Sequence, residues 1–126
     1  MSRTPVREAL QALDSLGDAG VNRLLGVYGG RAAAIADLCT GEFAHPLDKD
    51  GRVPAAEVVF AMREGVALPL EDVVFRRMMI GFDADQGRAL YDEVAAIAAA
   101  EAGWSSEQKT QQLDQLAEYA ESLRVR

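Results

Sequence analysis

The chain has 126 residues, of which 49% are hydrophobic and 26% are charged, a balance typical of one globular domain rather than of a disordered segment. Its net charge of −7 disfavours general binding to nucleic acid or to anionic lipid headgroups. One cysteine and one histidine exclude an internal disulfide and the common multi-cysteine and histidine-pair metal sites. The longest apolar run, Val94–Ala100, is too short to cross a membrane, and no apolar signal-peptide core follows Met1. We therefore expect a cytoplasmic protein with no direct membrane insertion and no nucleic-acid partner.

Alanine is the commonest residue, and apolar residues recur at helical spacing in separate segments. No Asn-Gly or Asp-Gly turn joins two β-branched runs, so hairpins are not indicated. The sequence predicts an all-α fold, a compact orthogonal or irregular bundle of about seven helices with no significant sheet. Residues 1–126 are expected to form a single helical domain, in which residues 1–19 are an N-terminal helical lead-in.

In chain order, helices are expected over about Pro5–Leu16, Ala19–Tyr28, Arg31–Cys39, Pro54–Glu64, Leu70–Gly81 and Asp85–Ala102, and from Ser105 onward. Residues 41–53 are rich in turn formers and are predicted to be a connector. Ser105, with Gln108 three residues later, is typical of a capping box. The predicted core comprises Leu24, Leu25, Ile35, Leu38, Val58, Met62, Val73, Val74, Leu90, Val94, Ile97, Trp104, Leu116 and Leu123.

Three short motifs invite a chemical interpretation, and a structural one is favoured for each. If Asp48 opened a calcium loop, Gly51 would fall at position 4 and not at position 6, so a turn is favoured. The segment Gly26–Arg31 is glycine-rich but has no strand before it and neither phosphate-loop spacing. Cys39 and His45 lack a third group to orient them. We predict no catalytic, cofactor-binding or metal-binding residue in this chain.

The adjacent arginines Arg76 and Arg77 stand in a predicted helix between two apolar triplets. Neighbouring helical residues project about 100° apart, so at least one of the two guanidinium groups must reach an edge of the core. One interpretation is an arginine that pairs with an acidic group of the same chain. The other is contact with another domain, because Arg and Met are enriched at interfaces. The candidate interface residues are Arg76, Arg77, Phe75, Met78 and Met79.

The order of several short motifs resembles a known domain. They are Val27-Tyr28-Gly29, Ala56-Glu57-Val58 with Arg63-Glu64, the run from Leu70 through Arg76-Arg77 to Gly81, and Glu101-Ala102-Gly103-Trp104-Ser105. Over roughly residues 20–122 the chain resembles the C-terminal helical domain of FAD-dependent (aerobic) glycerol-3-phosphate dehydrogenases. It departs from that family at Met78 and Met79, where Thr and a basic residue are usual, and at Pro69, where Thr often caps the helix.

The resemblance implies an accessory domain that packs on the FAD-binding catalytic domain of a parent enzyme. That parent would oxidise glycerol 3-phosphate to dihydroxyacetone phosphate and pass electrons through FAD to quinone, as a peripheral protein at the inner face of the membrane. The family's flavin and substrate residues lie in preceding domains, so the resemblance gives this chain no cofactor and no activity of its own. The chain would be either an excised domain or a free-standing relative.

Two other classes of function remain open. A free-standing helical protein–protein interaction module could self-associate as a homodimer through the apolar stripe of the last helix. A small helical enzyme has the least support, because no nucleophile or metal set converges in the sequence.

Overall fold

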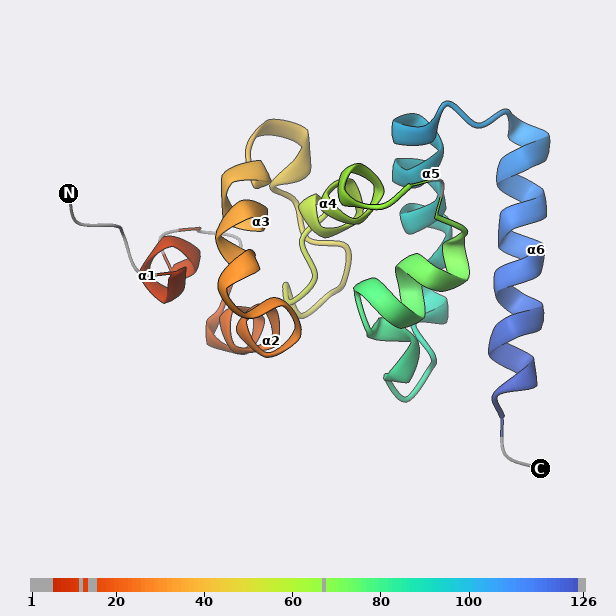
Figure 1. Ribbon diagram of the computed structural model, residues 1–126. Coiled ribbons are helices and arrows are strands. Elements are labelled where there is room, and N and C mark those ends of the chain that lie inside the picture. The colour runs from red at the N-terminus through yellow and green to blue at the C-terminus, as the bar shows by residue number, and fades with distance from the viewer. Residues whose placement is uncertain (1–5, 12, 14–15, 67, 125–126) are drawn as a thin grey trace. The chain divides into compact units, whose positions relative to one another are not determined.

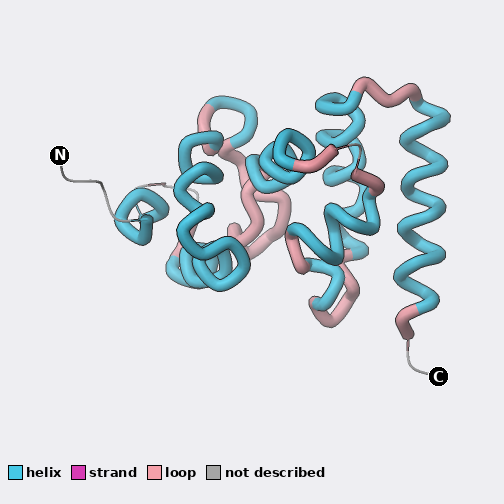
Figure 2. Tube along the Cα trace, viewed as in Figure 1, coloured by secondary structure: helices cyan, strands magenta, loops and turns pink. Residues whose placement is uncertain are grey.

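The computed structural model describes residues 6–11, 13, 16–66 and 68–124, and within them it confirms the all-α fold (Figure 1). In these residues six α-helices are joined by loops and short 3₁₀ helices, and the only β-type pairing is one isolated bridge between Pro46 and Pro54 (Figure 2). The fifth expected helix, over Leu70–Gly81, is present mainly as a π-helix rather than an α-helix. Pro5, which was expected in the first helical turn, lies outside the described residues.

The chain divides into two compact units between Phe60 and Ala61, within one helix. The first unit contains α1 (Val6–Gln11), α2 (Asp18–Tyr28), the 3₁₀ helix η1 (Gly29–Arg31), α3 (Ala32–Leu38), the 3₁₀ helix η2 (Gly41–Phe43) and the start of α4 (Ala56–Glu64). The second contains the end of α4, the π-helix η3 (Asp72–Arg77), the 3₁₀ helices η4 (Ile80–Phe82) and η5 (Arg88–Leu90), α5 (Tyr91–Ala102) and α6 (Ser106–Ser122). The assignment of residues 1–126 to one domain stays a prediction.

The core of the first unit forms where α1, α2 and α3 contact one another. Its buried residues are Leu10, Leu16, Val21, Leu24, Ala32, Ile35, Ala36, Cys39, Ala56 and Phe60. The predicted core positions Leu24 and Ile35 are confirmed, and Leu25 and Leu38 pack half-buried against the same cluster. Val58 of α4 is also fully buried, as predicted.

The connector between α3 and α4 is mostly loop (Figure 2). Asp48 organises it, because its Oδ1 accepts hydrogen bonds from the backbone N–H groups of Arg52 at 2.9 Å and of Val53 at 3.0 Å. The carboxylate is therefore engaged by the turn itself, as the turn interpretation expected.

In the second unit α5 and α6 lie side by side and run in opposite directions (Figure 1). The predicted core residues Val73, Val74, Val94 and Leu116 are fully buried. Met62, Leu90, Ile97 and Trp104 are half-buried. The prediction for Leu123 is wrong: it is 45% exposed, because α6 ends at Ser122 and the next residue has left the buried face of the helix.

Local signals set both ends of the α5–α6 connection. Gly103 takes the left-handed conformation after α5 (φ 73°), and the N–H groups of Gly103 and Trp104 both reach the carbonyl of Ala99. The predicted capping box is confirmed, since Ser105 Oγ accepts from Gln108 N–H at 3.1 Å and Gln108 Oε1 accepts from Ser105 N–H at 2.8 Å.

The expected start of α5 near Asp85 is wrong by about one and a half turns, because α5 begins at Tyr91. Gln86 and Gly87 have positive φ values of 59° and 76°, which an α-helix cannot contain. The Asp85 carboxylate accepts hydrogen bonds from the N–H groups of Gly87 and Ala89, and this favours a turn followed by a 3₁₀ helix.

Gly81 tests the packing of the second unit, because a Cβ atom added there would overlap the ring of Phe75. We expect Gly81→Ala to lower the free energy of unfolding by about 1–3 kcal/mol, as overpacking of a close-packed core does. Urea denaturation followed by circular dichroism would measure the change. Gly26→Ala is the matched control: no atom lies within 4 Å of its added Cβ, so the change should be neutral or stabilising. Equal losses in both variants would contradict the packing described.

Candidate docking surface

The predicted interface residues lie in the last half of the π-helix η3 and directly after it, in the second unit. Its wide turn is visible in the hydrogen bond from Met78 N–H to Val73 O, five residues back, at 2.8 Å. Phe75 and Met78 point inward and are 2% and 0% exposed, so they support the surface from beneath and do not line it. Such π-turns occur frequently at functional sites.

Exposed apolar residues follow directly after this helix. Met79 is 44% exposed and has a left-handed backbone conformation (φ 63°), which is unfavourable for a residue with a side chain. Phe82, at the end of η4, is 68% exposed. We call Arg76, Arg77, Met79 and Phe82 together the η3–η4 surface.

The buried ring of Phe75 anchors this surface to the second unit. Phe82 meets it edge to face, with ring centroids 5.7 Å apart, and Tyr119 of α6 does so from another side at 5.0 Å. The contact with Phe75 favours one orientation of the Phe82 ring, most of which is open to solvent.

The two arginines of the surface differ in their partners. Arg76 pairs with Asp72 one turn earlier, and its side chain is 66% exposed. Arg77 is half-buried and makes no side-chain hydrogen bond or ion pair with another residue of the described part of the chain. Of the two interpretations given for the adjacent arginines, pairing with an acidic group of the same chain fits Arg76. The docking role of Arg77 and its neighbours stays a prediction.

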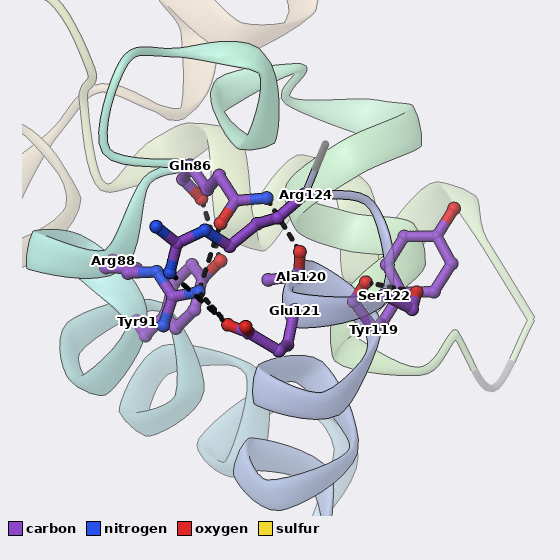
Figure 3. A network of polar contacts seen from close by, with 8 residues as sticks. All are labelled: Gln86, Arg88, Tyr91, Tyr119, Ala120, Glu121, Ser122 and Arg124. Carbon is purple, nitrogen blue, oxygen red and sulfur yellow. Dashed lines mark hydrogen bonds and ion pairs between the residues drawn. The ribbon is translucent and has the colours of Figure 1, made fainter. Parts of the chain in front are cut away.

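A second polar group of residues lies at the C-terminal end of α6 (Figure 3). Gln86 Nε2 donates to the carbonyl of Ala120 at 2.8 Å, and the hydroxyl of Tyr91 donates to the carbonyl of Gln86 at 2.7 Å. Arg88 and Arg124 each approach the carboxylate of Glu121 at 3.5 Å. These ion pairs are exposed and long, so each contributes only about 0–1 kcal/mol, and the network serves mainly to hold the end of α6.

The most buried polar cluster of the described residues centres on Glu57 of α4. Glu57 is 0% exposed, and it is the only charged residue among those described that is fully buried. Arg23 Nη1 donates to its Oε2 at 2.6 Å, and the hydroxyl of Tyr28 donates to its Oε1 at 2.8 Å. Both carboxylate oxygens are thus engaged by residues of α2, so the cluster ties α2 to α4.

The low-polarity surroundings shift the pKa values in this cluster. Burial raises the pKa of the Glu57 carboxyl above its usual value, and the ion pair with Arg23 opposes the shift without cancelling it. Burial, and then the charge of Glu57, raise the pKa of the Tyr28 hydroxyl. The same two causes raise the pKa of the Cys39 thiol to about 11, which leaves little thiolate at neutral pH.

The Cys39–His45 pair gains no support as a nucleophilic site. Cys39 is 5% exposed, and the Nδ1 of His45 lies 2.6 Å from the carbonyl oxygen of Glu42 in the connector. Among the described residues no group of three or more His, Cys, Asp or Glu side chains is arranged to hold a metal ion.

Two features of these sites were not found from the sequence. Phe82 follows Gly81 in a short segment without helical periodicity, and nothing in such a segment distinguishes an exposed aromatic residue from a buried one. Glu57 does carry a signal, since it is the one charged residue in the apolar stretch from Val53 to Ala61. A charge inside such a stretch indicates a buried ionic partner.

The motifs that carry the family resemblance meet in space within each unit. In the first unit Tyr28 and Glu57 share a hydrogen bond. In the second, Arg63 Nε donates to Glu101 Oε1 at 2.6 Å. The motifs thus join helices of the framework within each unit.

The described residues thus form a helical framework in which the buried Glu57 joins two helices. The exposed Phe82 lies in the segment that follows the π-helix η3. Comparison with known families identifies the domain more closely: residues 3–109 match the C-terminal domain of alpha-glycerophosphate oxidase, and the chain belongs to that family. It is therefore an accessory C-terminal domain of the glycerol-3-phosphate oxidase family. Comparisons with curated proteins and with solved structures gave no match. Within the described residues, no helix is both long enough and apolar enough to cross a bilayer.

The raised pKa of Glu57 predicts a pH dependence of stability. Because the folded state holds this proton more tightly than the unfolded state, Glu57 contributes most below about pH 4.5, and its contribution is lost as pH rises through its folded pKa. We expect the unfolding free energy of the wild type minus that of Glu57→Gln to fall from about pH 4 to about pH 8. Denaturation at a series of pH values would measure it, with the exposed Glu93→Gln as control. A constant or rising difference would contradict the sign.

The left-handed conformation of Met79 predicts opposite effects of two small substitutions. Met79→Gly should raise the free energy of unfolding by about 1 kcal/mol, because glycine adopts positive φ without steric cost. Met79→Ala removes the same side chain but keeps a Cβ, so it should not stabilise the chain. Thermal melts of the two variants would separate these effects, and equal stabilities would show that the backbone here is unstrained.

Proposed function

We propose that this chain packs, through its η3–η4 surface, on the flavin-binding catalytic body of a glycerol-3-phosphate dehydrogenase-like protein. The observation that carries the proposal is the 68% exposure of Phe82 in η4, which contacts η3. Arg77 of η3 has no side-chain partner among the described residues, and the same segment contains the π-helix and the left-handed Met79. Exposed aromatic and arginine side chains are enriched at interfaces, and strained backbone gathers at functional segments. Membership in the alpha-glycerophosphate oxidase C-terminal domain family supports a partner of this kind.

In this proposal the parent oxidises glycerol 3-phosphate to dihydroxyacetone phosphate and passes electrons through FAD to quinone, in the cytoplasm or at the inner face of the membrane. The one glycine-rich segment among the described residues does not have the geometry of a flavin site. FAD's pyrophosphate binds a glycine-rich turn between a strand and a helix. The glycine-rich segment Gly26–Arg31 instead lies at the end of α2 and continues into the 3₁₀ helix η1. The catalytic body would hold the flavin.

The alternative is a free-standing interaction module that self-associates through the apolar stripe of α6. Two residues of that stripe, Leu116 and Ala120, are fully buried in the second unit, where α6 contacts α5. That stripe is thus used within the unit, which favours docking through the η3–η4 surface.

The test mixes this chain with the purified flavin-binding body of an alpha-glycerophosphate oxidase produced without its own C-terminal domain. We expect a one-to-one complex by size-exclusion chromatography with light scattering, in which the flavin stays with the body. The chain alone should be colourless and should not oxidise glycerol 3-phosphate. A chain that retains flavin through gel filtration, or that forms only a homodimer, would overturn the proposal.

A further inference from the structure

The η3–η4 surface carries two features that specify the chemistry of the surface it contacts. The first is the exposed ring of Phe82, held by its edge-to-face contact with the buried Phe75 at 5.7 Å. A side chain already fixed in position loses little conformational entropy on binding. Aromatic anchors of this kind supply much of the free energy of association when they enter an apolar pocket.

The second feature is the positive charge of η3, the element that contacts η4, which carries Phe82. Arg76 is engaged by Asp72, whereas Arg77 has no hydrogen bond or ion pair with a described side chain. A half-buried guanidinium retains several unused N–H donors, and the acceptor that matches them best is a carboxylate, which can bind two at once. The carboxylate of Asp83, which follows Phe82 and is exposed, also has no partner among the described residues, so we expect the partner to place a hydrogen-bond donor opposite it.

We infer that the partner presents to this surface an apolar recess that receives Phe82, with a carboxylate at its rim that binds Arg77. This inference rests on the proposed function, because it assigns the recess to the flavin-binding body. A second copy of the chain fits less well. Each copy carries a net charge of −7, so two copies repel, and a two-fold axis through this surface would place like features near one another.

The experiment measures the dissociation constant between this chain and the purified flavin-binding body by isothermal titration calorimetry. Phe82→Ser should weaken binding by about 30-fold or more, and Arg77→Gln by about 10-fold. Val66→Ser and Arg88→Gln are matched controls, because Val66 is 92% exposed and Arg88 is exposed, and neither belongs to the η3–η4 surface. Both controls should bind within about twofold of the wild type.

Salt dependence separates a charge contact from a change of fold. The affinity of the wild type should fall as salt rises from 50 to 500 mM (roughly a threefold change in screening length), and Arg77→Gln should lose most of that dependence. Circular dichroism melts check that each variant is folded. If Phe82→Ser does not fold, Met79→Gly, which relieves a positive φ on the same surface, takes its place and should also weaken binding.

The outcomes distinguish this inference from the proposed function. If the wild-type chain does not bind the flavin-binding body at all, both fail. If it binds and Phe82→Ser and Arg77→Gln bind equally well, the proposed function stands and the inference is overturned. It is also overturned if light scattering shows a homodimer that these two substitutions abolish.

Discussion

A carboxyl group inside an apolar core needs hydrogen-bond partners for both of its oxygens, and Glu57 imposes that condition on the first unit. The condition requires α2 to present Arg23 and Tyr28 to α4 at hydrogen-bonding distance from both carboxylate oxygens. Replacing the pair with apolar residues would relax this requirement, whereas losing one partner would leave a buried charge uncompensated. The ion pair therefore specifies which face of α2 meets α4 more than it adds to stability.

The fold could largely be predicted because its signals are local. Each of these signals acts within a few residues of the chain. Examples are the left-handed glycine Gly103 that ends α5, the Ser105 capping box, and the helical spacing around Leu24, Val94 and Leu116. The prediction failed where side chains override that spacing. Asp85 binds two N–H groups ahead of it and delays α5, and the chain leaves the helix before Leu123 reaches the core.

The candidate site was harder to predict, because exposure is a property of the assembled chain. Phe75, Met78 and Met79 are all large apolar residues of one predicted helix, so the sequence does not distinguish them. In the structure the first two are buried and the third is exposed. What separates them is the π-turn, which depends on how the segment packs and not on a residue pattern. The exposure of Phe82 depends on tertiary packing in the same way: Gly81 lies against the Phe75 ring, and Phe82 touches that ring only edge to face.

The capping box and the length of α6 bear on how the chain begins to fold. With 17 residues, α6 exceeds the roughly 12–15 residues below which isolated helices are marginal, and its first turn is satisfied by side chains within four positions. The other described α-helices, at 12 residues or fewer, depend more on tertiary packing. The denatured ensemble should therefore keep its residual helix in the C-terminal segment, and α5 can find a partially ordered neighbour over a short loop, where closure entropy is small.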